Sequence, residues 1–212
     1  MKRYGYLALA FVLSAAAAVP LAAQTSTAGW KQRIDLSTNA SDPDPAGEVK
    51  FTADASGFHT SNPKAAIFYN PKNTATGNYT LKATFAQNAR SSHPNYIGLI
   101  FGGKDLEGAG QSYTYFMVAP QNGTWLLKQR TGDQTKDLAP RGTSEAVTRL
   151  DASNKASNTL EVRVAADKID YVVNGMVVHS TPKAGLNTDG IYGFRVNHAL
   201  PDVSISGLAV TK

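Results

Sequence analysis

Alternating apolar and polar residues mark the stretch from Asn158 to Ser180. Leu160, Val162 and Val164 alternate with polar residues, and a second alternating run leads to Asn174-Gly175. That dipeptide is typical of a two-residue hairpin turn, since both residues tolerate a positive φ. The pattern therefore predicts three short strands, with a hairpin that pairs Val173 with Met176, Val172 with Val177, Tyr171 with Val178 and Asp170 with His179.

Similar short runs continue through the rest of the chain. No long stretch after residue 23 keeps a helical period, and turn residues separate the runs at the spacing expected for a sandwich or barrel. We therefore predict an all-β fold, a two-sheet antiparallel β-sandwich. A turn is expected over residues 72–77 and a bulge at Gly207. Further strands are expected near residues 30–36, 48–52, 58–61, 65–70, 78–87, 96–103, 113–119, 124–130, 135–138, 191–196 and 203–210.

The first 23 residues have the plan of a secretory signal peptide. Lys2 and Arg3 precede an apolar run over residues 7–19, and small residues follow at Ala22 and Ala23. The run is short for a transmembrane helix, so an uncleaved anchor is the less favoured alternative. We expect residues 24–212 to form a single β-sandwich domain that is secreted or periplasmic and not membrane-bound after cleavage.

Composition removes several classes of function. The chain of 212 residues has no cysteine, which excludes disulfides and a thiol nucleophile. The formal net charge of +5 comes from scattered basic residues, a distribution unlike the clustered patch of a nucleic-acid-binding protein. A Gly-x-Ser-x-Gly nucleophile motif is also missing from the sequence.

The order of motifs from Gly77 onward resembles a known superfamily. The matching segments are 77–79, 97–102, 113–118, 123–127, 158–162, 171–175, 190–195 and 203–210. Together they are similar to the concanavalin A-like lectin/glucanase jelly rolls, including laminin-G-like domains and the bacterial 3-keto-disaccharide hydrolase-type domain. The resemblance implies two packed antiparallel sheets, one of them concave, with the ligand on the concave face or the rim loops. The Glu-x-Asp-x-x-Glu run of the glucanases does not occur in this sequence.

Acidic side chains in two loops are candidates for chemistry. Asp105 and Glu107 can serve acid–base sugar chemistry or bind calcium through oxygen, or they belong to a solvated loop. For Asp42 and Asp44, the prolines that follow favour a turn over a calcium loop. The four histidines show no His-x-x-x-His spacing, so we expect no metal site and no cofactor, with calcium as the alternative.

Four further residues are candidates for a binding or catalytic site. Arg195 ends a predicted strand on the side opposite the core and can bond sugar hydroxyls or a carboxylate, and nearby His198 can act as a base. Core packing accounts for most aromatic residues, but either Tyr115 or Trp125 is expected on an open face, where its ring can stack on a pyranose. Asp170 and His179 are expected to form a cross-strand polar pair.

Three hypotheses follow from these residues. The first is a secreted, non-catalytic module that binds a carbohydrate or cell-surface glycan through Tyr115, Trp125 and Arg195. The second is a glycoside hydrolase or lyase on modified (3-keto) sugars, with Asp105, Glu107, Arg195 and His198 as its site. The third is a structural envelope protein that uses the sandwich only for contacts.

Overall fold

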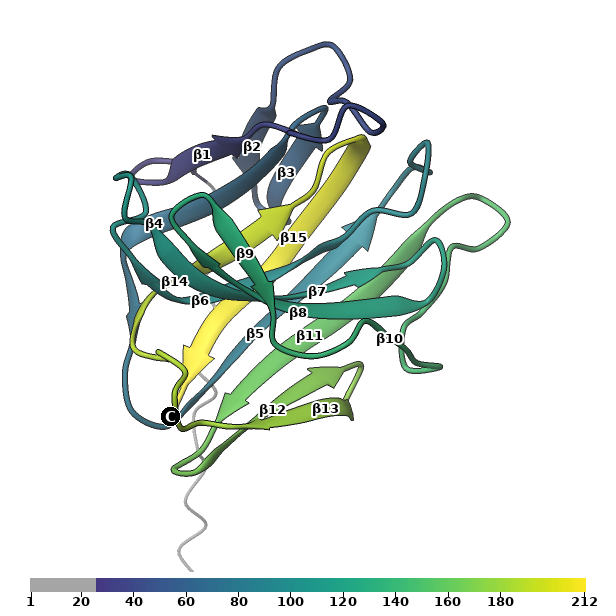
Figure 1. The fold of residues 1–212 in the computed structure, drawn as a ribbon. Coiled ribbons are helices and arrows are strands. Elements are labelled where there is room, and N and C mark those ends of the chain that lie inside the picture. The colour runs from purple at the N-terminus through teal and green to yellow at the C-terminus, as the bar shows by residue number, and fades with distance from the viewer. Residues whose placement is uncertain (1–25) are drawn as a thin grey trace, which may run out of the picture.

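A computed structural model describes residues 26–212, which fold into two antiparallel sheets (Figure 1). The predicted signal peptide, residues 1–23, lies outside the described residues. Sheet A has the order β1 (Lys31–Asp35), β4 (Ala65–Ala75), β14 (Gly190–Val196), β6 (Ile97–Lys104), β7 (Ser112–Ala119), β8 (Thr124–Thr131) and β10 (Gly142–Thr143), with β9 (Gln134–Asp137) also paired to β8. Sheet B has the order β13 (Met176–Pro182), β12 (Lys168–Val173), β11 (Ala156–Val164), β5 (Tyr79–Gln87), β15 (Leu200–Thr211), β3 (Gly57–Asn62) and β2 (Lys50–Asp54). The predicted two-sheet β-sandwich is confirmed.

The main core lies between the two sheets and is built from alternate residues of each strand. Phe116 and Leu127 of sheet A and Leu81 and Val162 of sheet B are completely buried in it. Each such side chain contributes about 1.5–3 kcal/mol on leaving water. The sandwich can therefore form without disulfides.

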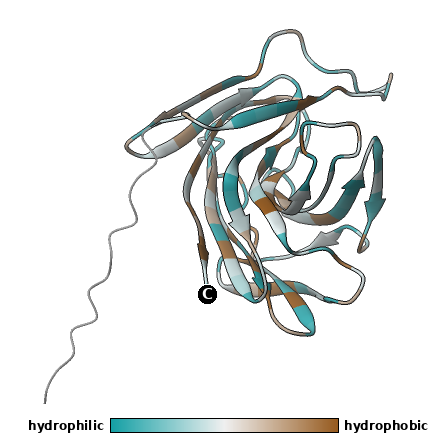
Figure 2. Cartoon of the chain, turned by 90° about the vertical axis from the view of Figure 1, so that its left-hand side faces the viewer, coloured by the Kyte–Doolittle hydropathy of each residue, from teal (hydrophilic) through white to brown (hydrophobic). Residues whose placement is uncertain are grey.

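Sheet A is apolar on its second face too, which explains the nearly continuous hydrophobic runs of β6 and β7. Ile67, Ile100, Tyr115, Met117 and Leu126 form a separate buried cluster on the face that points away from sheet B. Leu106 from the 105–111 loop packs on the same cluster. Figure 2 shows that the strands on one side of the molecule are strongly curled. We call this side of sheet A, which points away from sheet B, the hollow face; buried apolar side chains form its floor.

The hairpin around Asn174-Gly175 joins β12 and β13 as predicted, but its register differs beyond the second pair. Val173 pairs with Met176 and Val172 with Val177, after which a bulge shifts the partners. Tyr171 therefore pairs with His179 and Asp170 with Ser180, so the predicted pairs Tyr171–Val178 and Asp170–His179 are wrong. The extra residue in β13 turns the His179 ring toward Tyr171, with 6.1 Å between ring centroids.

Two other local expectations have different outcomes. The turn predicted over residues 72–77 is wrong, because β4 continues to Ala75 and its end pairs with β14. The bulge at Gly207 is confirmed by a register shift between Ser206 and Ala209, where Gly207 has a φ of 62°. Among residues 26–212, no helical segment has the length and apolar character needed to span a bilayer.

Candidate functional site

A polar cleft opens on the hollow face of sheet A. Its volume is about 380 Å³, and its floor comes from β7, β8 and β14 through Tyr115, Lys128 and Arg195. Three loops complete the rim with Asp42, His93 and His198. The cleft therefore combines residues from segments that are far apart in the sequence.

Arg195 is the charged centre of the floor. Its Nη1 donates to the Asp35 carboxylate and, at 3.0 Å, to the Tyr113 hydroxyl, while Nε donates to Asn197 Oδ1 at 3.2 Å. The guanidinium carbon lies 5.4 Å from the centre of the Tyr115 ring, a cation–π distance. Burial disfavours the charge, but Tyr113 and Asp35 outweigh it and raise the pKa of Arg195. The sheet thus holds a permanent positive charge in a nearly closed environment.

The two tyrosines beside Arg195 are neutral at physiological pH. Burial raises the pKa of Tyr113 to about 12, and burial also raises the pKa of Tyr115. The two rings lie with their centroids 5.7 Å apart along β7. Their hydroxyl groups therefore remain both donors and acceptors of hydrogen bonds over the ordinary pH range.

Further cationic and aromatic side chains line the cleft. Arg141 lies over the Tyr96 ring at 5.1 Å, and the Tyr96 hydroxyl bonds Thr124 Oγ1 at 2.8 Å. Lys128 forms an ion pair with Asp137 of β9 at 3.2 Å. These residues add an aromatic ring and charged hydrogen-bond donors to the lining.

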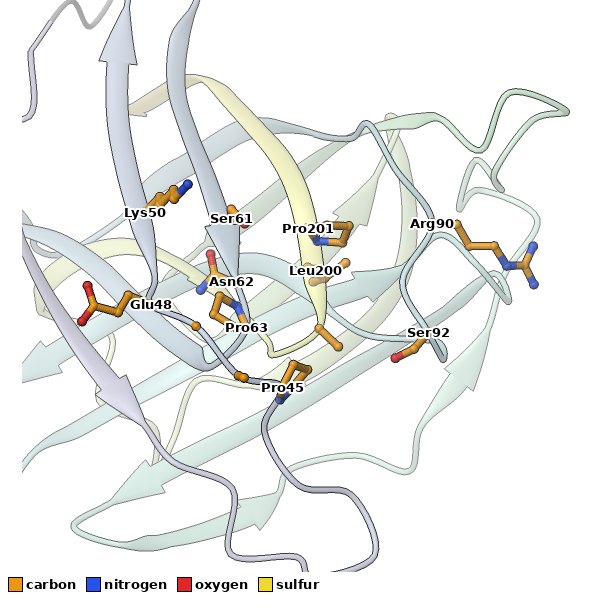
Figure 3. A pocket seen from close by; sticks show the side chains of 13 residues that line it. Pro45, Glu48, Lys50, Ser61, Asn62, Pro63, Arg90, Ser92, Leu200 and Pro201 are labelled. Atoms are coloured by element: carbon orange, nitrogen blue, oxygen red, sulfur yellow. The ribbon is translucent and has the colours of Figure 1, made fainter.

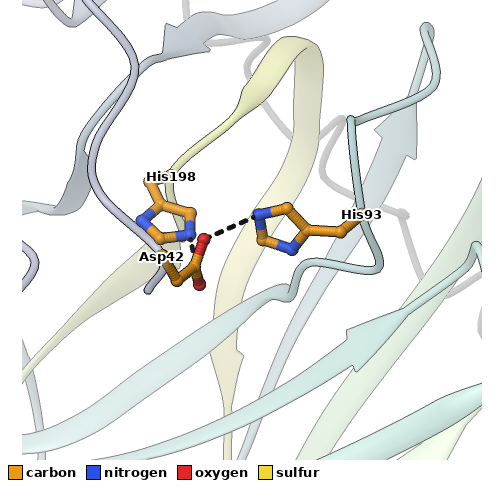
Figure 4. Close-up of side chains that lie close together, drawn as sticks. All are labelled: Asp42, His93 and His198. Carbon is orange, nitrogen blue, oxygen red and sulfur yellow. Dashed lines mark ion pairs between the residues drawn. The ribbon is translucent and has the colours of Figure 1, made fainter. Parts of the chain in front are cut away.

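At the rim, Asp42 lies between two imidazoles (Figure 4). Its Oδ1 is 3.1 Å from His93 Nε2, and its Oδ2 is 3.2 Å from His198 Nε2. His198 Nδ1 contacts Asp44 Oδ1 at 3.0 Å. The sequence spacing gave no sign of this group, because the three loops that carry it meet only in the folded sandwich.

The loop that carries both aspartates is the proline-containing turn expected from its sequence. Ser37 organises it: its backbone N–H donates to Asp44 Oδ2 at 2.8 Å, and its hydroxyl donates to the Asp42 carbonyl at 2.8 Å. The turn aims both carboxylates at His198.

Of the six residues singled out from the sequence, the structure brings Tyr115, Arg195 and His198 together around the cleft. Trp125 lies elsewhere: it is 6% exposed in the core between the sheets and stacks on His179 at 5.1 Å. Strand alternation decides this, because Leu126 next to it takes the hollow face. Trp125 is therefore a core residue.

Asp105 and Glu107 also lie outside the described lining of the cleft. Leu106 between them is buried, whereas both acids are exposed on the 105–111 loop. Glu107 accepts two hydrogen bonds from Lys31 Nζ, at 2.6 and 2.7 Å. This ion pair helps to fasten the loop to β1.

A second, more apolar hollow lies at the edge of sheet B (Figure 3). Pro45, Pro63, Leu200 and Pro201 supply its apolar lining, with Lys50 and Glu48 beside them. Its lining carries no aromatic ring, whereas the cleft on sheet A is lined by Tyr96 and Tyr115. The polar cleft on sheet A is therefore the better candidate for a specific site.

Comparisons with known proteins agree on the architecture. No protein-family model matches the sequence, and no curated protein matches it. Among solved structures, the carbohydrate-binding module CBM66 from Bacillus subtilis is similar with a TM-score of 0.61 and 8% identity, over 90% of this chain and 98% of that one. A glycoside hydrolase family 16 endo-glucanase from Bacteroides ovatus is similar with a TM-score of 0.57 and 8% identity, over 85% of this chain and 94% of the other.

The exoplasmic/lumenal domain of VIP36 is similar as well, with a TM-score of 0.52 and 10% identity, over 86% of this chain and 79% of that domain. Identities this low establish the shared fold and nothing finer. The sheet order, the hollow face and these neighbours together show that the chain has the concanavalin A-like lectin/glucanase jelly-roll fold that its motifs resemble.

Proposed function

We propose that this protein is an exported carbohydrate-binding module that holds a glycan in the cleft on the hollow face of sheet A. The observation that carries the proposal is the lining of that cleft, where tyrosine rings lie beside cationic and amide side chains. Sugars combine apolar ring faces with a rim of hydroxyls, and such a surface complements both parts. Solved proteins with this fold include a carbohydrate-binding module and a Ca²⁺/Man2-bound form of VIP36, which agrees with the proposal.

The charges of the cleft narrow the class of ligand. Lys128, Arg141 and Arg195 contribute three cations, whereas Asp42 is the one carboxylate among the described lining residues. Asp35 and Asp137 compensate two of the cations, and Arg141 is left exposed over Tyr96. A sugar with a carboxylate or another acidic substituent beside Arg141 fits this distribution best.

The same lining favours binding over glycosidic cleavage. Glycosidases of the usual kind need two carboxyl groups on either side of the scissile bond. Asp105 and Glu107 lie outside the cleft, and Asp42 is held by two histidines. The side chains that converge here are suited to hydrogen bonding and stacking.

A glycan array followed by isothermal titration calorimetry on the best ligand tests the proposal. We expect Arg141→Ala to weaken binding about tenfold or more, since a charge-assisted hydrogen bond contributes about 1.5–3 kcal/mol. Lys72→Ala, an exposed lysine in the far half of β4, is the matched control and should bind normally. Absence of any glycan ligand, or equal losses in both variants, would overturn the proposal and favour a structural role.

A further inference from the structure

We propose that Asp42, His93 and His198 bind a divalent transition-metal ion of the zinc class at the rim of the cleft. Their ligand atoms, two imidazole nitrogens and a carboxylate oxygen, all lie within 4.8 Å of one another. The proposal goes beyond glycan binding and does not depend on it. It also departs from the sequence-based expectation of no metal site.

The spacing of the three side chains suits a metal of this size. In a tetrahedral zinc site, bonds of about 2.0–2.1 Å place neighbouring ligand atoms about 3.3–3.4 Å apart. Asp42 oxygens lie 3.1 Å from His93 Nε2 and 3.2 Å from His198 Nε2. These two distances run to different oxygens of Asp42 (Figure 4), so the Asp42 carboxylate must turn and the imidazoles must close in from within 4.8 Å to share one ion.

The groups behind the imidazoles are those that metal-binding histidines require. Asp44 Oδ1 lies 3.0 Å from His198 Nδ1, so it can accept a hydrogen bond from Nδ1–H. The Nε2 lone pair is then free to bind a metal. The Asn95 side chain lies 3.4 Å from His93 Nδ1 and offers an acceptor oxygen if its amide is flipped. His198 thus has a partner that fixes its ring in the metal-binding form, and His93 gains one when the Asn95 amide turns its oxygen toward Nδ1.

Hydrogen bonds near the three ligands hold their loops in place. The Ser91 hydroxyl donates to the His93 carbonyl at 2.5 Å, and Asn197 N–H donates to the Tyr96 carbonyl at 3.0 Å next to His198. Ser37 fixes the aspartate loop through its bonds to Asp42 and Asp44. Three loops are therefore fastened so that their side chains meet at one point.

Burial leaves the site open on one side. The His198 side chain is 12% exposed, whereas those of Asp42 and His93 are 42% and 40% exposed. Because all three line the cleft, a fourth coordination position is accessible to water or to an oxygen of a bound ligand. Two nitrogens and one oxygen favour zinc, copper, nickel or cobalt over magnesium and calcium, which prefer oxygen ligands only.

The experiment is a calorimetric titration of Zn²⁺ into untagged, chelator-treated protein, with Mg²⁺ and Ca²⁺ titrated in parallel. We expect one Zn²⁺ per chain and much weaker binding of the other two ions. His93→Gln or His198→Gln should weaken Zn²⁺ binding about a hundredfold or more, and Asp44→Asn about tenfold through the orientation of His198. Co²⁺ should give a visible absorption spectrum that both histidine variants lose.

The matched control is His59→Gln, because His59 also lies 3.1 Å from an aspartate, Asp54, but on sheet B. It should bind Zn²⁺ like the unmodified protein. Thermal unfolding of every variant in chelator separates loss of a ligand from loss of the fold. The proposal is overturned if Zn²⁺ binding is undetectable, or if His59→Gln reduces it as much as His93→Gln does; Asp42 and the two imidazoles would then form only a hydrogen-bonded cluster.

Discussion

The pair of Arg195 and Asp35 gives the sharpest test of how the hollow face is held together. Their side chains are only 10% and 8% exposed, and Tyr113 and Arg130 complete the group around the carboxylate. Replacing Arg195 by Met keeps most of the packing volume but leaves the Asp35 charge in a poorly hydrated place. The loss of one partner from such a buried pair costs about 3–5 kcal/mol.

Arg130 lowers that figure, since its Nη1 remains 3.4 Å from Asp35 Oδ2 and can move closer. We therefore expect Arg195→Met to reduce the free energy of unfolding by about 3 kcal/mol. Asp35→Leu should cost a similar amount, because it leaves Arg195 uncompensated. The double variant should lose at least about 1 kcal/mol less than the sum of the two single losses, because no unpaired charge remains between them.

Urea unfolding gives the free energy of unfolding of the unmodified protein, the two single variants and the double variant, with the midpoint and slope fitted separately. Lys31→Met is the control: it removes the ion pair with Glu107, whose side chains are 46% and 64% exposed, and should change stability by less than about 1 kcal/mol. Additive losses in the double variant, or a loss from Arg195→Met as small as that from Lys31→Met, would refute the view that this pair organises the floor.

Three further predictions concern single positions. Asn174→Ala should lower the free energy of unfolding in urea by about 2 kcal/mol, because Asn174 has a φ of 49° and its side-chain amide donates to three acceptors. Asn174→Gly tolerates the positive φ but loses the amide, so it separates the backbone contribution from that of the hydrogen bonds. Gly98→Ala should cost about 3 kcal/mol in the same assay, because a Cβ there would lie 2.2 Å from the Phe116 carbonyl oxygen. Hydrogen bonds from the Ser56 side chain and backbone, with a smaller effect of His59, lower the pKa of Asp54 to about 2. Because the carboxylate is favoured in the folded state, ionised Asp54 stabilises the fold above pH 3.8, and this stabilisation is lost as pH falls through about 2. In Ser56→Ala, NMR titration should find the pKa of Asp54 closer to 3.8.

Most strands of the fold could be predicted from local patterns in the sequence. The strand predicted over residues 78–87 follows from alternation, and those over residues 113–119 and 124–130 follow from short apolar runs bounded by turn residues. Both signals depend only on neighbours in the chain. The hairpin register was partly missed because a bulge changes the partner of Tyr171 without any marker such as glycine at Val178. The end of β4 was missed because its lysine and asparagine resemble a turn, whereas pairing with β14 overrides that local preference.

The site was less accessible to sequence reasoning, and the reason is physical. Arg195 was recognisable because it alternates with the apolar residues Phe194 and Val196 on its strand, whereas Tyr115 was one of two aromatic candidates for an open face. For Trp125 parity alone could not decide, since the residues on both sides of sheet A are apolar. Asp105 and Glu107 were candidates for acid–base chemistry because they are close in sequence. In the structure Leu106 between them is buried, and both acids lie exposed on the loop.

Asp42, His93 and His198 show the opposite case, where residues 51 and more positions apart become neighbours. No local pattern encodes their meeting, because it depends on how three loops at one end of the sandwich are fastened. The floor of the cleft and its rim therefore obey different constraints. The floor is fixed by strand pairing and a buried ion pair, so its substitutions should be measured as losses of stability. The rim is fixed by a few hydrogen bonds within loops, so substitution of its imidazoles should change ligand or metal affinity while the sandwich stays folded.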